Sequence, residues 1–391
     1  MQRFVLVIGA GQAGLAAAYH LARAGEPFVV VDGADRVGDS WRARYDSLTL
    51  FTPRQFSALP GLNLDGNREL YPGRDEFAGY LERYASHFEF PIRLNTRVVR
   101  LCKDDGVFNA TLDDGFEIRA SEVIVATGGF QQALTPAVAG QFGSGVLQLT
   151  TQTYRNPHQL PEGPVLVVGD GASGRDIAAE AAQSQSTILS TGKPRRLFPE
   201  RVFGKSVWWW LNVSGVLRAP AESWIGHKLK QSDAFPDRGR SFSALAGLGV
   251  RIAPRLSGAS GGEARFADGT SAAIRTVIWA VGYRDDNRWI DISGAMAADG
   301  SVFQRGGISP VPGMFFVGRP WQRNRASALV MGAGPDAGHV VASLLHERNM
   351  NGNGRGLGRA AELGEAPCGA SPVRLRQSGS RYAASPAVTP R

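Results

Sequence analysis

One short glycine pattern occurs twice in this chain of 391 residues, each time directly after a run of apolar residues. The first copy, Gly9-Ala10-Gly11-Gln12-Ala13-Gly14, follows Phe4 to Ile8, and the second, Gly169-Asp170-Gly171-Ala172-Ser173-Gly174, follows Val165 to Val168. A short apolar run that ends in glycine is typical of a strand buried on both faces. Because an alanine-rich stretch follows each copy, the order strand, tight turn, helix indicates that the chain builds a βαβ unit twice.

The segments that follow each glycine pattern also occur in a similar order. After the first, a helix is predicted over 74–88, alternating segments at 96–101, 107–112 and 116–119 predict hairpins, and a strand follows at 123–126. After the second, a hairpin around 266–270 precedes a strand at 277–281, and 314–317 and 327–346 predict a last strand and a closing helix. We therefore predict an α/β protein with two Rossmann-like dinucleotide-binding domains, each made of three-layer β/β/α elements.

The first glycine turn has the residues that a dinucleotide needs. Gly9 permits the tight turn, Gly11 lets the backbone approach a pyrophosphate, and Gly14 allows the helix to pack closely on the strand. Asp32 ends the next strand, 23 residues after Gly9, where its carboxylate can accept from ribose hydroxyls and would repel a 2′-phosphate. This pattern favours FAD or NAD over NADP; the alternative is a purely structural glycine turn.

The second turn is followed by hydroxyls and cations in place of an acid. Its next strand ends at Ser190-Thr191 and continues into Gly192-Lys193-Pro194-Arg195-Arg196. Hydroxyl and guanidinium groups suit the 2′-phosphate of NADPH, and the alternative is a solvated basic loop. Two nucleotide sites predict that one cofactor is held while the other visits to deliver hydride.

Charge and composition exclude several other classes of protein. The net charge is +8, but half of it lies in residues 351–391, which carry six arginines and two glutamates in a Gly-, Ala- and Pro-rich context that predicts a disordered tail. The remaining cations are dispersed among acids, so we expect no nucleic-acid partner. No apolar run is long enough to cross a bilayer, so no stable membrane insertion is expected. Scattered histidines predict no metal site, and just two cysteines without CxxC favour a reducing cytoplasm.

Several stretches resemble the flavin-containing monooxygenase superfamily, the class B flavoprotein monooxygenases, and especially its bacterial members near YUCCA-type and Baeyer–Villiger-type enzymes. The resemblance covers about residues 3–346. It rests on both glycine turns and, in order, on Val37 to Trp41, Tyr45 to Phe56 before Leu59-Pro60-Gly61, Ala126 to Phe130, Ala280 to Tyr283, and Gly313 to Gly318.

The resemblance implies that FAD binds the first turn and NADPH the second, with the NADPH domain inserted into the FAD domain. We accordingly expect FAD-domain segments at 1–160 and 276–348, an NADPH domain at 161–275, and a tail at 349–391. It also implies that a flavin C4a-(hydro)peroxide oxygenates a small organic or heteroatom-containing substrate. The expected partners are that substrate and dioxygen, and a homodimer is left open.

The two turns and the resemblance together predict the residues of each site. Thr52, Gln322 and Arg323 are the candidates for side chains near the flavin. The predicted FAD residues are Gly9, Gly11, Gln12, Ala13, Gly14, Asp32, Gly33, Gly38, Trp41, Thr52, Val98, Thr127, Gly128 and Gly318. The predicted NADPH residues are Gly169, Gly171, Ala172, Ser173, Gly174, Ser190, Arg195, Arg196, Ala280, Val281, Gly282 and Tyr283.

One family feature is largely lost. Many members have F-x-G-x-x-x-H-x-x-x-Y/W between the two turns, whereas this chain has Ser144, Val146 and Thr150 at the Phe, Gly and His positions and retains only Tyr154. Two alternatives to a monooxygenase stay open, and the lost fingerprint bears on the first of them. One is an NADPH-dependent flavin reductase or oxidase that passes electrons to another acceptor, and the other is a non-catalytic flavoprotein that senses NADP(H).

Overall fold

A five-stranded parallel sheet forms the centre of the first domain. The computed structural model describes residues 4–192, 195–232 and 235–353. The strand order is β22-β7-β1-β2-β3, and all four pairings are parallel. The bounds are β1 Val5–Ile8, β2 Phe28–Val31, β3 Ile92–Arg93, β7 Glu122–Val125 and β22 Met314–Phe316.

Two different layers cover the two faces of this sheet. Helices α1 (Gln12–Arg23), α3 (Arg74–His87) and α8 (Val330–Asn353) lie on one face, and an antiparallel meander of β4 (Val98–Asp104), β5 (Val107–Leu112) and β6 (Glu117–Ala120) lies on the other. Alternate side chains of β1 belong to different cores, with Val5 and Val7 on the helix side and Leu6 and Ile8 on the meander side. The run is continuously apolar because both faces are buried.

The second domain repeats this arrangement. Its parallel sheet has the order β16-β11-β10-β20-β9, with β9 Leu147–Thr150, β10 Val165–Val168, β11 Thr187–Ser190, β16 Arg251–Ala253 and β20 Thr276–Trp279. One face carries α4 (Ala172–Ala181) and α7 (Phe242–Gly247), and the other carries β17 (Leu256–Ser260), β18 (Glu263–Phe266) and β19 (Ser271–Ala273). The expected two-domain α/β fold with three-layer units is confirmed.

The second sheet is inserted in the chain between β7 and β22, which pair with each other. The chain leaves the first domain through β8 (Gln132–Ala133) and returns through β21 (Tyr283–Arg284), and these two strands pair antiparallel between the lobes. The expected boundaries at 160/161 and 275/276 are wrong, because β9 and β20 both belong to the second sheet. The edge strand β9 is only half-buried and therefore lacks the apolar pattern of an inner strand.

The last helix is longer than the sequence predicted. It was expected over 327–346 but runs from Val330 to Asn353, and the rest of the expected tail lies outside the described residues. Within the described ranges, no helix is long and apolar enough to span a membrane.

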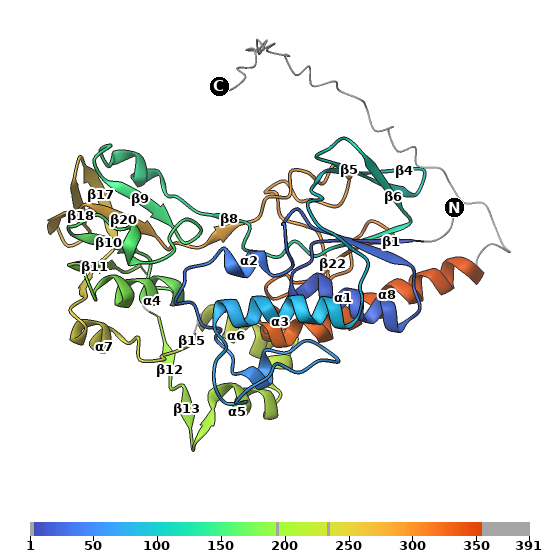
Figure 1. Ribbon diagram of the computed structural model, residues 1–391, viewed down its shortest axis with the longest axis horizontal. Helices are drawn as coiled ribbons and strands as arrows, with labels where there is room; N and C mark the ends of the chain where they lie inside the picture. Colours follow the sequence, from blue (N-terminus) through green and yellow to red (C-terminus); the bar gives the residue numbers. More distant parts are fainter. Residues whose placement is uncertain (1–3, 193–194, 233–234, 354–391) are drawn as a thin grey trace, which may run out of the picture.

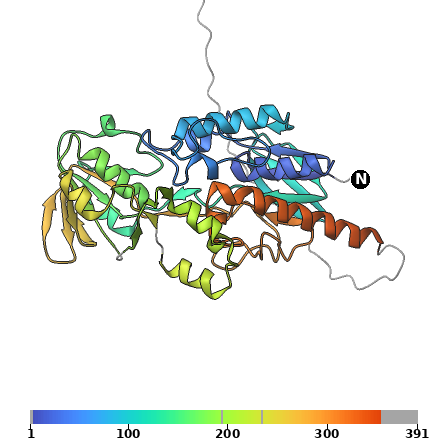
Figure 2. The same cartoon turned by 90° about the horizontal axis from the view of Figure 1, so that it is seen from below.

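A third group of short elements projects from the body between β11 and β16 (Figures 1 and 2). It comprises β12 (Leu197–Phe198), β13 (Arg201–Val202), β14 (Lys205–Ser206), α5 (Val207–Val213), α6 (Trp224–Ser232) and β15 (Phe235–Pro236). Trp208 anchors the group by packing with Leu217 and Ala326 in a small core. The remaining elements are α2 (Asp39–Arg42) and the short helices η1 (Arg54–Phe56), η2 (Ala137–Gln141), η3 (Pro157–Gln159), η4 (Val216–Arg218) and η5 (Arg325–Ala328).

Candidate functional site: two facing nucleotide turns

The three glycines of the first turn have distinct surroundings. Gly9 has φ +109°, and a Cβ there would lie 2.7 Å from the Ala126 oxygen, while a Cβ on Gly14 would lie 1.8 Å from the Gly9 oxygen. A Cβ on Gly11, in contrast, would have no atom within 4 Å. Gly9 and Gly14 are therefore required by the packing of strand and helix, whereas Gly11 keeps the start of α1 open to a ligand. The turn fits a dinucleotide pyrophosphate.

Asp32 fastens this turn to the end of β2. Its Oδ2 accepts from the Ala10 amide at 2.6 Å and its Oδ1 accepts from the Ala34 amide at 2.8 Å. The carboxylate oxygens keep further lone pairs for ribose hydroxyls. Nearby, Gln12 accepts from the indole nitrogen of Trp41 at 3.1 Å, which joins the start of α1 to α2.

Two other predicted segments come together with the first turn. The Thr127 amide nitrogen would be 3.3 Å from a Cβ on Gly9, and a Cβ on Gly318 would be 2.6 Å from the Ala13 Cβ. Gly128 has φ +70° and open space beside it. The turns after β7 and β22 therefore border the start of α1.

Three predicted glycine and valine positions are closely packed against neighbouring segments. A Cβ on Gly38 would be 2.6 Å from the Ala78 oxygen, and one on Gly33 would be 3.2 Å from the Arg97 Cβ. The Val98 side chain lies in the core beneath the meander. At Val98 only the backbone is left for a nucleotide contact.

The side chains predicted near the flavin form their hydrogen bonds inside the protein. Thr52 is buried, with its hydroxyl 2.7 Å from that of Ser57. Gln322 is also buried; its amide donates to the Phe316 oxygen at 2.9 Å and accepts from the Arg319 amide at 3.3 Å. The Gln322 side chain therefore braces the end of β22, and its proximity to the flavin stays a prediction.

Arg323 likewise points toward the last helix. It donates to the Pro335 oxygen at 3.1 Å and faces the Asp336 carboxylate at 3.4 Å. Burial raises the pKa of Asp336, and Arg323 offsets part of that effect. Arg323 thus holds α8 against the segment after β22, and its contact with the flavin stays a prediction.

The second turn has the same geometry as the first. Gly169 has φ +107°, with a Cβ 2.4 Å from the Ala280 oxygen, and a Cβ on Gly174 would again lie 1.8 Å from the preceding turn glycine, Gly169. A Cβ on Gly171 would have no atom within 4 Å. The turn after β20, with Ala280, borders α4 as Ala126 borders α1. This turn also fits a dinucleotide.

The predicted 2′-phosphate residues divide into two groups. Ser190 is buried, and its hydroxyl donates to the Pro254 oxygen at 2.9 Å and accepts from the Leu256 amide at 2.9 Å. The Ser190 proton is thus used to fix the chain between β16 and β17, and a contact of Ser190 with the 2′-phosphate stays a prediction. Arg196 is exposed, and Arg195 lies 3.4 Å from the Asp170 carboxylate in the second turn. Lys193 and Pro194 lie outside the described residues.

A buried ion pair beneath the second turn was not predicted. Asp170 and Arg175 are each 2% exposed, and Arg175 donates to the Asp170 backbone oxygen at 2.9 Å and faces its carboxylate at 3.4 Å. Arg175 also lies 4.2 Å over the Phe242 ring. Burial lowers the pKa of Arg175, and Asp170 opposes that shift. The Asp170 carboxylate is thus shared by Arg175 and Arg195.

The carboxyl ends of the two parallel sheets face each other at an aromatic contact. Phe130, shortly after β7, meets Tyr283, shortly after β20, edge to face at 5.4 Å. The Tyr283 hydroxyl accepts from Thr151 at 2.7 Å and from Arg44, whose guanidinium carbon lies 4.9 Å from the Tyr283 ring centre. No local sequence pattern marks Arg44 as a site residue, because its partner Tyr283 is 239 positions away.

The segment that contains Arg44 is held by both domains. Tyr45 is buried in the core of the second domain, and its hydroxyl donates to Asp176 at 3.3 Å. Burial and the nearby Asp176 charge raise the pKa of Tyr45. Asp46 accepts from Asn156 at 2.6 Å, and this hydrogen bond lowers the pKa of its carboxyl. The stretch that leads to Thr52 therefore bridges the two nucleotide domains.

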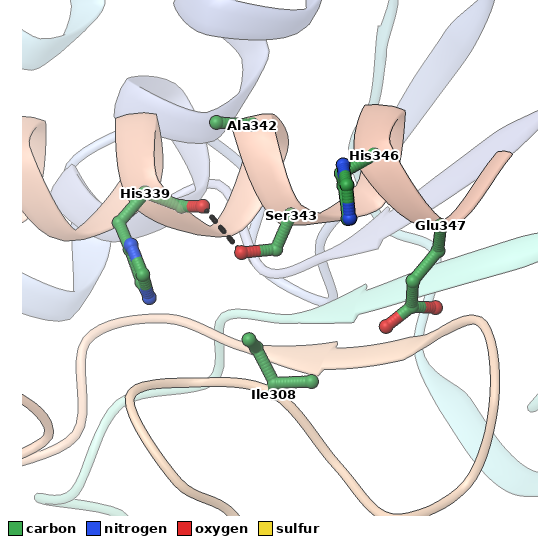
Figure 3. A pocket seen from close by; sticks show the side chains of 6 residues that line it. All are labelled: Ile308, His339, Ala342, Ser343, His346 and Glu347. Atoms are coloured by element: carbon green, nitrogen blue, oxygen red, sulfur yellow. Dashed lines mark hydrogen bonds between the residues drawn. The ribbon is translucent and has the colours of Figure 1, made fainter. Parts of the chain in front are cut away.

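A separate hollow of about 300 Å³ lies along α8 (Figure 3). It is lined by Ile308, His339, Ala342, Ser343, His346 and Glu347, and the Ser343 hydroxyl donates to the His339 backbone oxygen. None of the predicted nucleotide residues lines it, so it is distinct from the two turns.

Known proteins share this arrangement. The family model for pyridine nucleotide-disulphide oxidoreductases matches residues 6–197. The CzcO-like oxidoreductase of Geobacillus kaustophilus (strain HTA426) is 43% identical over 344 residues, covering 88% of this chain and 98% of that protein. The indole-3-pyruvate monooxygenase YUCCA1 of Oryza sativa subsp. japonica is 29% identical over 338 residues, covering 78% and 82%. The flavin-containing monooxygenase from Stenotrophomonas maltophilia aligns with a TM-score of 0.73 at 26% identity, covering 88% of this chain and 99% of that one.

The fold and the two turns define an oxidoreductase of the flavin-containing monooxygenase superfamily, which confirms the resemblance found in the sequence. Within that superfamily, the chain belongs to the CzcO-like oxidoreductases.

Proposed function

We propose that this protein is a FAD-dependent, NADPH-consuming monooxygenase that oxygenates a small organic or heteroatom-containing substrate. The observation that carries the proposal is the pair of open glycine turns, Gly11 and Gly171, on two parallel sheets whose carboxyl ends meet at Phe130 and Tyr283. Nucleotides bind outside the carboxyl ends of such strands. Two dinucleotides bound in this way would direct their reacting rings toward the same space.

The two turns differ in charge, which supports different occupants. The Asp32 carboxylate at the first turn suits ribose hydroxyls and disfavours a 2′-phosphate, so FAD is assigned there. Arg195 and Arg196 beside the second turn suit the 2′-phosphate of NADPH. When bound, reduced FAD supplies the reaction with dioxygen at C4a. The protein's own contribution is to bind and orient both nucleotides and to close the space between the domains.

The names of relatives support a monooxygenase over other flavoenzymes. The YUCCA1 protein is an indole-3-pyruvate monooxygenase, and the Stenotrophomonas maltophilia protein is a flavin-containing monooxygenase. We therefore propose that this protein is also a monooxygenase and that its substrate is a small organic molecule. We also propose a cytoplasmic location, which the two-cysteine composition favours.

A second candidate is an NADPH-dependent flavin reductase or oxidase. It is favoured by one observation, the replacement of the family histidine by Thr150, whose backbone oxygen accepts from the Tyr154 amide at 2.9 Å at the end of β9. Stopped-flow mixing of the NADPH-reduced protein with oxygen separates the candidates. A transient flavin–oxygen adduct supports the monooxygenase, whereas direct reoxidation without it supports the oxidase. A protein that binds FAD and NADPH without reduction would be a sensor, and one that cannot be loaded with FAD would contradict all three functions.

A further inference from the structure

Arg44 lies at the contact between the two domains, with its guanidinium beside the Tyr283 ring. Within the described part of the chain, its guanidinium forms no ion pair, and its hydrogen-bond partner is the neutral Tyr283 hydroxyl. The neighbouring Arg42 is paired with Asp39 and Glu82, and Arg74 is paired with Asp46 and Asp75. A partly buried guanidinium that rests on aromatic rings and has no ion-pair partner among the described residues keeps donors that can bind an anion.

The position of Arg44 is fixed from both sides. Its backbone oxygen accepts from Arg74 at 2.7 Å, and the oxygen of the preceding Ala43 accepts from Arg155 at 2.6 Å. The following Tyr45 is buried in the second domain. The guanidinium therefore does not lie on a freely moving loop, and its place against Tyr283 is set by the docking of the two domains.

Tyr283 adds a second donor at the same place. Its hydroxyl oxygen accepts from both Arg44 and Thr151, so its own proton is left for a further acceptor. Gly282, next to it, has φ +101° and no atom within 4 Å of a Cβ position. Phe130 is 56% exposed and lies against the Tyr283 ring. The approach to the guanidinium and hydroxyl is thus open and bordered by an aromatic ring.

We propose that Arg44 and Tyr283 form an anion-binding site between the two nucleotide turns, which takes the oxygens of a phosphate or a carboxylate. The anion comes either from the pyrophosphate of the visiting nicotinamide nucleotide or from the acid group of an organic substrate. Both sources are compatible with the position of the pair, because it borders the turns after β7 and β20. This inference rests on the proposed function for the identity of its two sources.

Four variants test the site. Arg44→Gln removes the charge, Arg44→Lys keeps the charge but loses the planar fork, and Tyr283→Phe removes only the hydroxyl. Arg36→Gln is the matched control, because Arg36 is 60% exposed and already paired with Asp39 at 3.3 Å. Each variant is first checked for a melting temperature close to that of the wild type. If Arg44→Gln is poorly folded, Arg44→Lys and Tyr283→Phe carry the test.

The measurements separate the two sources of the anion. If the nucleotide supplies it, Arg44→Gln raises the KM for NADPH and NADH alike by about 10- to 100-fold, with benzoate binding unchanged, as expected for a lost charge-assisted hydrogen bond. If an organic acid supplies it, both KM values are unchanged and the affinity for benzoate falls by a similar factor. In either case Arg44→Lys causes a smaller loss of affinity than Arg44→Gln, and Tyr283→Phe weakens the binding of the same ligand.

Direct calorimetric titration with inorganic pyrophosphate and with benzoate keeps this test independent of turnover. Binding of either probe that is lost in Arg44→Gln and kept in Arg36→Gln supports the site, even if the protein fails to reduce FAD with NADPH and the proposed function falls. If Arg44→Gln matches Arg36→Gln in both KM values and in both titrations, or if the wild type binds neither probe and the KM values do not move, the site is overturned.

Discussion

Arg175 donates to the backbone oxygen of Asp170 and faces the carboxylate of the same residue, and both side chains are almost completely buried within the second glycine turn. The same carboxylate faces Arg195 on its other side. Asp170 therefore connects the buried Arg175 beneath the turn with the partly exposed Arg195 beside it.

Replacing Asp170 by Asn should destabilise the protein. The change removes the carboxylate that faces the buried Arg175 guanidinium at 3.4 Å, which costs about 3 kcal/mol in the free energy of unfolding. Urea unfolding followed by circular dichroism measures this. The double variant Asp170→Asn/Arg175→Met should recover much of the loss, and Asp299→Asn, at an exposed position, serves as a control. Equal stability of Asp170→Asn and wild type would contradict the importance of the pair.

Replacing Arg195 by Ala should discriminate between the two nicotinamide nucleotides. Because only NADPH has a 2′-phosphate, we expect the KM for NADPH to rise by about 10- to 100-fold while that for NADH changes little. The rate of flavin reduction, measured with NADPH and with NADH on the same protein, gives the two KM values to compare. An equal effect on NADPH and NADH, or a wild type that prefers NADH, would refute the assignment of the second turn.

Two glycines of the first turn should respond differently to the same added methyl group. At Gly14 the new Cβ would lie 1.8 Å from the Gly9 oxygen, so Gly14→Ala should fold poorly. At Gly11 the position is open, so Gly11→Ala should keep the melting temperature of the apoprotein but weaken FAD binding by crowding the pyrophosphate. Thermal melts and FAD titration of the apoprotein check both variants. A Gly11→Ala protein with normal FAD affinity would show that the pyrophosphate does not approach this turn.

His20 should make stability depend on pH. Burial lowers the pKa of its ring below the ordinary value of 6.5, and the ring nitrogen lies 3.1 Å from the Gly334 oxygen on α8. The unfolded chain takes up the proton more readily than the folded protein. The contribution of the His20 contact to the free energy of unfolding is therefore fully present above pH 6.5 and is lost as the pH falls through the lowered pKa. His20→Gln should therefore flatten the fall of the melting temperature between about pH 7.5 and 5.5. The exposed His158→Gln is the control, and an unchanged slope in His20→Gln would argue against this role.

The parts of the fold that could be predicted are those that a short stretch of sequence determines by itself. The strands β1 and β10 are apolar on both faces and end in glycine, so their place in two parallel sheets follows from local pattern. The half-buried strand β9 has no such pattern, and the boundary at 160 was wrong for that reason.

The site shows the same division. The turn glycines and Asp32 are marked by spacing alone. Ser190, however, has hydrogen-bond partners 64 and 66 positions away, which make it structural, and the Arg44–Tyr283 contact joins residues of different domains. In a sequence, a hydroxyl or cation that holds the fold together cannot be told from one that binds a ligand when both follow a glycine turn. Their hydrogen-bond partners, which lie far away in the sequence, distinguish the two roles.

The pairing of β8 with β21 has a consequence for how the two domains are connected. Since β7 and β22 pair directly, the first sheet has all its strands without any part of the second domain. The second domain can therefore be regarded as one long surface loop of the first, closed at its base by the β8–β21 ribbon. Lengthening such a loop adds little to its closure entropy. A short turn that joined the chain across that ribbon would leave every strand of the first sheet with its neighbours.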